Sequence, residues 1–191
     1  NELLHIRYIP AARIYQVNKG WRSEDKTGFL IGMTSGFWKK ESDLQNSTEN
    51  NSRIGLYTTN TADALYIEPI PALDLSYNGI VTLQYAMKFA IENHFQVESS
   101  EIGACLMGEG ESPNIFLYEN TEGSIGVLSL IAQKQDVYKK IVELAYSLLA
   151  YDDENYKPNA SYRDLLNYYN QRDHENIDRW EIQDALKKLI A

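Results

Sequence analysis

The chain has 191 residues, of which 43% are apolar and 12% aromatic, so it can bury one sizeable core and is too apolar to be disordered. Its net charge of −9 disfavours a protein dedicated to sequence-independent nucleic-acid binding, which depends on Lys and Arg at the phosphates. A single cysteine, Cys105, excludes an internal disulfide framework. Because no apolar run could cross a bilayer and the first residues lack the pattern of a signal peptide, we expect a cytoplasmic protein without membrane contact.

The first third of the chain is predicted to form β-strands. Short runs rich in Ile, Tyr, Val and Leu alternate with turn-forming residues, and they cover residues 3–9, 13–18, 28–33, 52–59 and 62–70. Residues 39–52, with the sequence KKESDLQNSTENNS, are almost wholly polar and predict a mobile surface loop. Apolar residues then recur at three- and four-residue steps over residues 80–94, which predicts a helix.

A hairpin and a helical region are predicted after that helix. Residues 101–108 and 114–119 flank a tight turn, and Cys105 is expected there as a small buried apolar side chain. From Gly123 onward the periodicity is helical, with apolar stripes over residues 137–148 and 182–189. This order predicts a single α+β domain over residues 1–191, with a mainly antiparallel sheet, one central helix and a C-terminal helical bundle.

The sequence carries none of the strong catalytic or metal-binding motifs. Phosphate-binding loops, dinucleotide fingerprints, paired cysteines, the H-E-x-x-H motif and the nucleophile elbow are missing. Scattered carboxylates leave open a divalent-metal nuclease or another hydrolase, and they include Asp63, Glu101, Glu109 and Glu119. Such a site usually adds a Lys or His, and residues 95–133 contain neither. We therefore expect no catalytic residue, no metal and no cofactor.

The segment SYRDLLNYYNQRDHENIDRW, residues 161–180, has the highest density of polar and aromatic groups. Ser161 is expected to cap a helix that buries Tyr162, Leu165, Leu166 and Tyr169, and Asp178 is expected to cap a second helix. Where the two helices meet, we expect a structural polar network rather than a binding site, formed by Asn170, Gln171, His174, Asp178 and Arg179.

Positive charge is concentrated near the N-terminus. Residues 1–40 hold seven Lys or Arg and three acidic residues, whereas the remainder of the chain is strongly acidic. Contact with nucleic acid or with a partner is therefore expected at Arg13, Lys19, Arg22, Lys39 and Lys40. An ordinary solvated surface remains the alternative for these residues, because only the fold decides whether they share a face.

Several segments carry a family resemblance through their order along most of the chain. They are YIPAARIYQVNKGWR with GFLIG, TADALYIE, TLQYAMKFAIENHF, NIFLYENTEGSIGVL and ASYRDLLNYYNQRDHENIDRWEI. Together they resemble the C-terminal domain of DEAD/DEAH-box helicase-related proteins of the MrfA and DISARM DrmB type. The resemblance implies a glycine turn that leads into a helix, with Glu119, Gly123 and Gly126.

The chain departs from that family at its zinc site. Zinc-binding members carry a C-x-x-C pair whose register falls here on Ser161 and Asp164, and these residues cannot replace two thiolates. Ser124 stands where many relatives have a second glycine. We therefore expect an MrfA-type domain that lacks the zinc cysteines.

The resemblance implies a non-catalytic accessory domain of a helicase-related protein in DNA repair or phage defence. Since the chain contains no helicase motif, the expected partner is a helicase motor domain of the same chain or a helicase partner subunit. DNA would be bound weakly or indirectly. Two alternatives stay open at this point, the metal-dependent nuclease or hydrolase and a stand-alone protein-interaction module.

Overall fold

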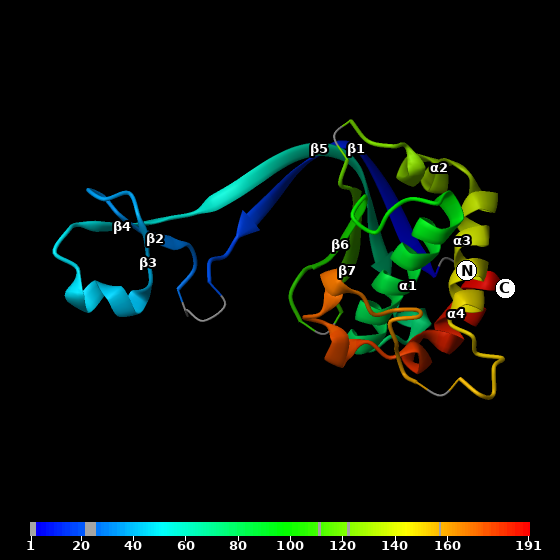
Figure 1. The fold of residues 1–191 in the computed structure, drawn as a ribbon. Helices are drawn as coiled ribbons and strands as arrows, with labels where there is room; N and C mark the ends of the chain where they lie inside the picture. Colours follow the sequence, from blue (N-terminus) through cyan, green and yellow to red (C-terminus); the bar gives the residue numbers. More distant parts are fainter. Residues whose placement is uncertain (1–2, 22–25, 111, 122, 157) are drawn as a thin grey trace. The chain divides into compact units, whose positions relative to one another are not determined.

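The computed structural model describes residues 3–21, 26–110, 112–121, 123–156 and 158–191. The chain divides into two compact units, a larger unit of residues 1–12 and 61–191 and a smaller unit of residues 13–60. Strands β1 (Leu4–Asn18) and β5 (Leu56–Pro69) each contribute residues to both units (Figure 1). β1 thus covers two of the predicted strand segments without a break.

The larger unit is built on a four-stranded sheet with the order β1-β5-β7-β6. The predicted hairpin is confirmed as β6 (Ile102–Met107) and β7 (Asn114–Glu119), and β7 pairs antiparallel with both β6 and β5. With the helices described next, this sheet gives the α+β fold that the sequence predicts. Because side chains alternate between the two faces of a strand, Cys105 lies opposite the buried Ile102 and is exposed. The prediction of a buried cysteine was wrong.

Helix α1 (Tyr77–Phe95) is the predicted central helix. The Ser76 side chain caps it by accepting a hydrogen bond from Gly79 N at 2.9 Å, and the helix ends at Gln96, whose φ of 56° is left-handed. Strands β6 and β7 contact α1, and so do α3 (Gln135–Leu148) and the C-terminal segment. Since neighbours surround the helix, even polar residues on it are buried.

The remaining regular elements of the larger unit are helices. They are α2 (Val127–Gln133), α4 (Gln183–Ile190) and the short 3-10 helices η2 (Pro71–Leu73), η3 (Tyr168–Asn170), η4 (His174–Asn176) and η5 (Arg179–Ile182). The core draws on the sheet and on α1 to α4. No helix of the described residues combines the length and the apolar character needed to span a bilayer.

The helix predicted after Ser161 does not form. Residues 161–167 fold into turns, and Tyr162 and Tyr169 are each 69% exposed, while Leu165 is buried as expected. Side-chain oxygens take backbone N–H groups that a helix would need: Asp164 accepts from Leu165 N, and Asn167 accepts from Tyr169 N and Asn170 N. Short polar side chains compete in this way with helical hydrogen bonds.

The smaller unit contains a three-stranded sheet with the order β3-β2-β4. Its strands are β2 (Phe29–Gly32), β3 (Trp38–Lys39) and β4 (Asn51–Ile54). The segment 39–52, predicted as a polar loop, contains the 3-10 helix η1 (Glu41–Asn46) and the start of β4. Polar side chains of this segment form hydrogen bonds with nearby backbone groups.

Glu49 shows this local use. Its carboxylate accepts hydrogen bonds from Ser35 Oγ at 2.7 Å, Ser35 N at 2.8 Å and Thr34 N at 3.1 Å, and it contacts Lys39 Nζ at 3.1 Å. The hydrogen bonds from Ser35, followed by that from Lys39, lower the pKa of Glu49 to about 2. The carboxylate therefore fixes the turn between β2 and β3.

We expect the Glu49 carboxyl to titrate near pH 2 instead of its ordinary value of 4.5. Because the folded-state pKa is depressed, the stabilisation by Glu49 is complete above the ordinary pKa and is lost as the pH falls toward 2. Carboxyl-carbon NMR titration measures this midpoint. Ser35→Ala should raise it and Ser42→Ala should leave it unchanged, whereas an ordinary midpoint in the unaltered chain would contradict the hydrogen-bond assignment.

Candidate functional site

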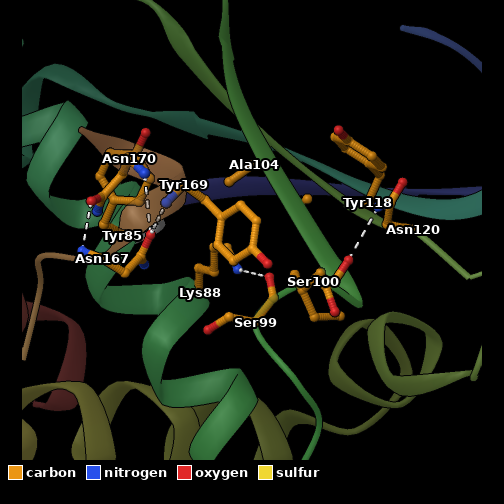
Figure 2. Close-up of a pocket in the computed structure, with 12 residues that line it drawn as sticks. Tyr85, Lys88, Ser99, Ser100, Ala104, Tyr118, Asn120, Asn167, Tyr169 and Asn170 are labelled. Atoms are coloured by element: carbon orange, nitrogen blue, oxygen red, sulfur yellow. Dashed lines mark hydrogen bonds between the residues drawn. The ribbon is translucent and has the colours of Figure 1, made fainter. Parts of the chain in front are cut away.

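A polar pocket of about 250 Å³ lies between α1, the edge strand β6 and the turn before η3 (Figure 2). Aromatic rings, hydroxyls, amides and one ammonium group line it, among them Tyr85, Lys88, Ser99, Tyr118, Asn167 and Tyr169. Pockets of this kind, with a few convergent polar groups, are the usual places to look for ligand binding. The pocket is therefore the first candidate site of the larger unit.

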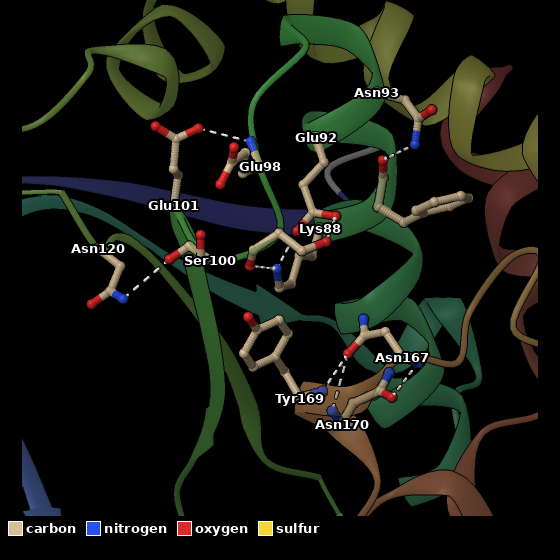
Figure 3. A network of polar contacts seen from close by, with 12 residues as sticks. Lys88, Glu92, Asn93, Glu98, Ser100, Glu101, Asn120, Asn167, Tyr169 and Asn170 are labelled. Carbon is tan, nitrogen blue, oxygen red and sulfur yellow. Dashed lines mark hydrogen bonds and ion pairs between the residues drawn. The ribbon is translucent and has the colours of Figure 1, made fainter.

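Lys88, which lines the pocket, belongs to a buried ion pair. The side chains of Lys88 and Glu92 lie one helical turn apart on α1 and are 7% and 8% exposed. Lys88 Nζ contacts Glu92 Oε1 and donates to the carbonyl oxygen of Ser99 at 2.8 Å, and Ser99 Oγ donates to Glu92 Oε2 at 2.8 Å (Figure 3). The pair is neutral overall, so the Lys88 charge is compensated beside the pocket. The sequence analysis missed the pair, although its i,i+4 spacing was visible.

The turn that contains Asn170 is another part of the pocket lining, and Asn170 is 1% exposed. Asn170 Nδ2 donates to the Leu165 carbonyl at 2.7 Å, and its Oδ1 accepts from Asn167 N at 2.8 Å. His174 Nε2 lies 2.9 Å from the same Oδ1 and 3.2 Å from the Asn167 carbonyl. The structure thus brings Asn170 and His174 together, whereas Gln171 is exposed.

Asp178 and Arg179 belong to a second cluster. Asp178 caps η5 by accepting from Trp180 N at 2.9 Å, as the sequence predicts for the start of the last helical segment, and it also accepts from Asn159 Nδ2 at 2.8 Å. Four of the five residues predicted as one network are therefore distributed between two clusters, because the chain turns again between His174 and Asp178, and Gln171 belongs to neither.

Arg179 is fully buried and binds the backbone. Its guanidinium donates to the carbonyls of Leu149 and Ala150, the latter at 3.2 Å, and to that of Tyr156. It also lies 4.3 Å from the ring centroid of Trp180 and 4.5 Å from that of Tyr156. These contacts join the end of α3 to the C-terminal helices, and they combine charge-assisted hydrogen bonds with cation–π attraction.

The predicted glycine turn surrounds a buried carboxylate. Glu119 is 0% exposed, and its oxygens accept hydrogen bonds from Ile125 N at 2.6 Å, Gly126 N at 3.0 Å and Leu128 N at 2.8 Å. Gly123 and Gly126 have φ angles of 84° and 81°, which L side chains rarely adopt. The turn therefore presents the unpaired N–H groups at the start of α2 to a single acidic side chain.

Asp63 connects this turn to β1. It accepts from Tyr8 Oη at 2.6 Å and from Ala11 N at 3.1 Å, while its own N–H donates to Ser124 Oγ at 2.7 Å. Ser124 stands at the predicted second-glycine position with a left-handed φ of 59°. The hydrogen bond to Asp63, together with burial, raises the pKa of Tyr8 to about 12.

The carboxylates considered for a metal site bind backbone groups or lie apart from one another. Asp63 and Glu119 bind the backbone groups described above, and Glu101 accepts from Glu98 N at 2.7 Å. Within the described part of the chain, no group of three or more His, Cys, Asp or Glu residues is close enough to hold a metal ion.

The predicted contact residues near the N-terminus lie in the smaller unit. Lys39 is paired with Glu49, and Arg13, Lys19 and Lys40 are exposed. Arg22 lies outside the described residues. One of these cations is therefore already neutralised within the chain.

The chain matches no protein-family model and no curated protein. Two solved structures are similar to it. The crystal structure of the DUF1998 helicase MrfA bound to DNA is 12% identical with a TM-score of 0.48, over 100% of this chain and 26% of the helicase chain. The crystal structure of the same helicase bound to DNA and AMPPNP is 13% identical with a TM-score of 0.40, over 79% of this chain and 19% of that one. The chain thus spans about a quarter or less of these helicase chains, and the low scores carry no conclusion about activity or ligands.

We expect Arg179→Ala to destabilise the larger unit by about 3 kcal/mol, because three carbonyls lose their buried donor. For a chain of this size, that loss lowers Tm by roughly 6–12 °C. Arg179→Lys should lose most of the same stability, since one ammonium group cannot reproduce the planar fork of donors. Arg163→Ala is the control, because Arg163 is exposed and contacts the Tyr156 ring at 5.4 Å. Equal melting temperatures for Arg179→Ala and the control would contradict a structural role.

Glu119→Gln should destabilise the fold by about 2–4 kcal/mol. Replacing one carboxylate oxygen by an amide directs its N–H groups at backbone donors, whichever way the amide is turned. Chemical denaturation of the variant and of the exposed control Glu98→Gln measures the difference. A midpoint that is unchanged in Glu119→Gln would mean that the turn does not depend on the charge.

Proposed function

We propose that this chain is a non-catalytic accessory domain of a helicase-related protein in DNA repair or phage defence, where it organises the motor, a partner subunit or the path of the DNA. The family resemblance of the sequence supports this role. The observation that carries it is that two buried charged residues in the resembling segments bind backbone groups: Glu119 binds the glycine turn and Arg179 binds the end of α3.

This use of charged groups favours a structural role over catalysis. A general acid, base or metal ligand has to reach the reacting atoms, and a side chain whose acceptors are directed at buried N–H groups does not. Glu119 is engaged in this way, and the two oxygens of Asp63 accept from Tyr8 Oη and Ala11 N. The nuclease or hydrolase alternative would therefore require other residues, and no specific observation favours it.

The charge distribution supports weak or indirect contact with DNA. The net charge of the chain is −9, and the ion pair with Glu49 takes Lys39 out of the expected contact set. Three exposed cations of that set remain among the described residues: Arg13, Lys19 and Lys40. Each cation neutralises about one phosphate, so these residues can contact about three phosphates. A dedicated DNA-binding protein contacts far more.

We expect the chain to bind duplex and single-stranded DNA weakly at physiological salt, with a log–log salt slope of roughly −2 to −4. Titration of fluorescent oligonucleotides at several salt concentrations measures the slope. The double variant Lys19→Glu, Lys40→Glu should abolish the residual signal, while Lys187→Glu on α4 should change it little. Tight binding that survives the double variant, or cleavage of the probe with magnesium or manganese, would refute the accessory role and favour a nuclease.

The helicase association has its own test. The reading frame that contains this chain, or the frames beside it, should encode helicase motifs, and the purified chain should bind that motor in a direct assay. If no motor is encoded there, the helicase association is wrong. That outcome would favour the alternative of a stand-alone protein-interaction module.

A further inference from the structure

The strand register divides the side chains of the smaller sheet between two chemically different faces. Ile31 pairs with Trp38 on one side and with Ser52 on the other, and Phe29 pairs with Ile54. Paired residues in antiparallel strands point to the same face. Phe29, Ile31, Trp38, Ser52 and Ile54 therefore share one face, which we call the aromatic face.

The opposite face carries the charged residues of the strands. Leu30 pairs with Lys39 and with Arg53, so all three lie on this second face. Lys39 Nζ lies 3.1 Å from Glu49, and Arg53 forms an ion pair with Glu41. Every charged side chain of β2, β3 and β4 thus lies away from the aromatic face, where acidic neighbours from η1 and the following turn neutralise it.

The aromatic face exposes large rings. Trp38 is 51% exposed and Trp21 is 45% exposed, and both pack edge-on against Phe29, with ring centroids 5.5 Å and 5.6 Å away. Met33 and Phe37, in the turn that joins β2 to β3, are 63% and 72% exposed. Apolar side chains of this size, grouped on one small unit, are typical of a protein–protein contact.

The smaller unit also has little apolar interior of its own. Among its described residues, the buried large apolar side chains are Phe29 and Leu30. The one cysteine of the chain lies in the larger unit, so no disulfide can reinforce residues 13–60. A unit of this length usually needs a disulfide, a metal or a partner to compensate for its small core.

We propose that the aromatic face, with Trp21 and Trp38 at its centre, is a docking surface for an uncharged, apolar patch on another protein. Single-stranded nucleic acid also stacks on exposed rings, but it needs cations beside them, and the strand cations lie on the opposite face in ion pairs. The aliphatic Ile31 and Ile54 on the same face add contact area that suits a protein surface. The inference stands whether or not the partner is a helicase motor, so its failure is distinguishable from that of the proposed function.

Site-specific photo-crosslinking in the full-length protein, inside its own cells, tests the docking surface. Trp38 is replaced by p-benzoylphenylalanine, and Tyr162→p-benzoylphenylalanine is the matched control, since Tyr162 is an exposed ring of the larger unit. We expect the Trp38 probe to form one reproducible adduct with another protein, at an apolar residue identified by tandem mass spectrometry, and the control to lack it. An adduct with DNA, an adduct with a second copy of this chain, or no adduct at all would overturn the proposal.

The second test uses the partner protein that the crosslink identifies. That partner is purified, and its affinity for the intact chain is measured. Trp38→Glu and, independently, Trp21→Glu should weaken its binding to the intact chain by about 30-fold, the effect of losing a central interface residue. Tyr162→Glu, the same kind of change at an exposed ring of the larger unit, should alter affinity by less than about threefold. Near-ultraviolet circular dichroism confirms that each variant is folded. Equal affinities of the two Trp variants and the control would overturn the proposal.

Discussion

The C-terminal part of the larger unit depends on one constraint, the need of buried backbone carbonyls for hydrogen-bond donors where no helix or sheet supplies them. Between α3 and α4 the chain consists of turns and short 3-10 helices. The Arg179 guanidinium supplies donors to Leu149, Ala150 and Tyr156 and stacks between aromatic rings. The carbonyl of Arg179 in turn accepts from Tyr151 Oη at 2.5 Å. A single side chain thus fixes a segment that lacks a regular hydrogen-bond ladder.

Elsewhere in the chain, acidic side chains bind backbone N–H groups as Arg179 binds backbone carbonyls. Glu119 satisfies three N–H groups at the start of α2, and Glu49 satisfies two N–H groups in the turn between β2 and β3. The buried pair of Lys88 and Glu92 is completed by Ser99. Charged side chains are used at these places as local substitutes for the hydrogen bonds of regular secondary structure.

The two units differ in how they use apolar side chains. The larger unit buries them in a continuous core formed by the sheet and by α1 to α4. The smaller unit exposes Trp21, Phe37 and Trp38 and buries few large apolar groups among its described residues. Stability is therefore provided within the larger unit, whereas the surface of the smaller unit is suited to contact with another molecule.

The sequence by itself determined the elements whose signals are local. Alternation predicted β6 and β7, three- and four-residue spacing predicted α1 and α3, and Asp178 was recognisable as a cap. Tertiary structure decided the rest, because its causes connect residues far apart in the sequence. Arg179 meets Leu149 across 30 positions, and the burial of Lys88 and Glu92 follows from the elements packed around α1. The helix expected after Ser161 does not form because Asp164 and Asn167 side chains accept hydrogen bonds from backbone N–H groups, which helical periodicity does not reveal. The separation of rings from charges on the smaller sheet depends on strand register, which exists only once the strands have paired.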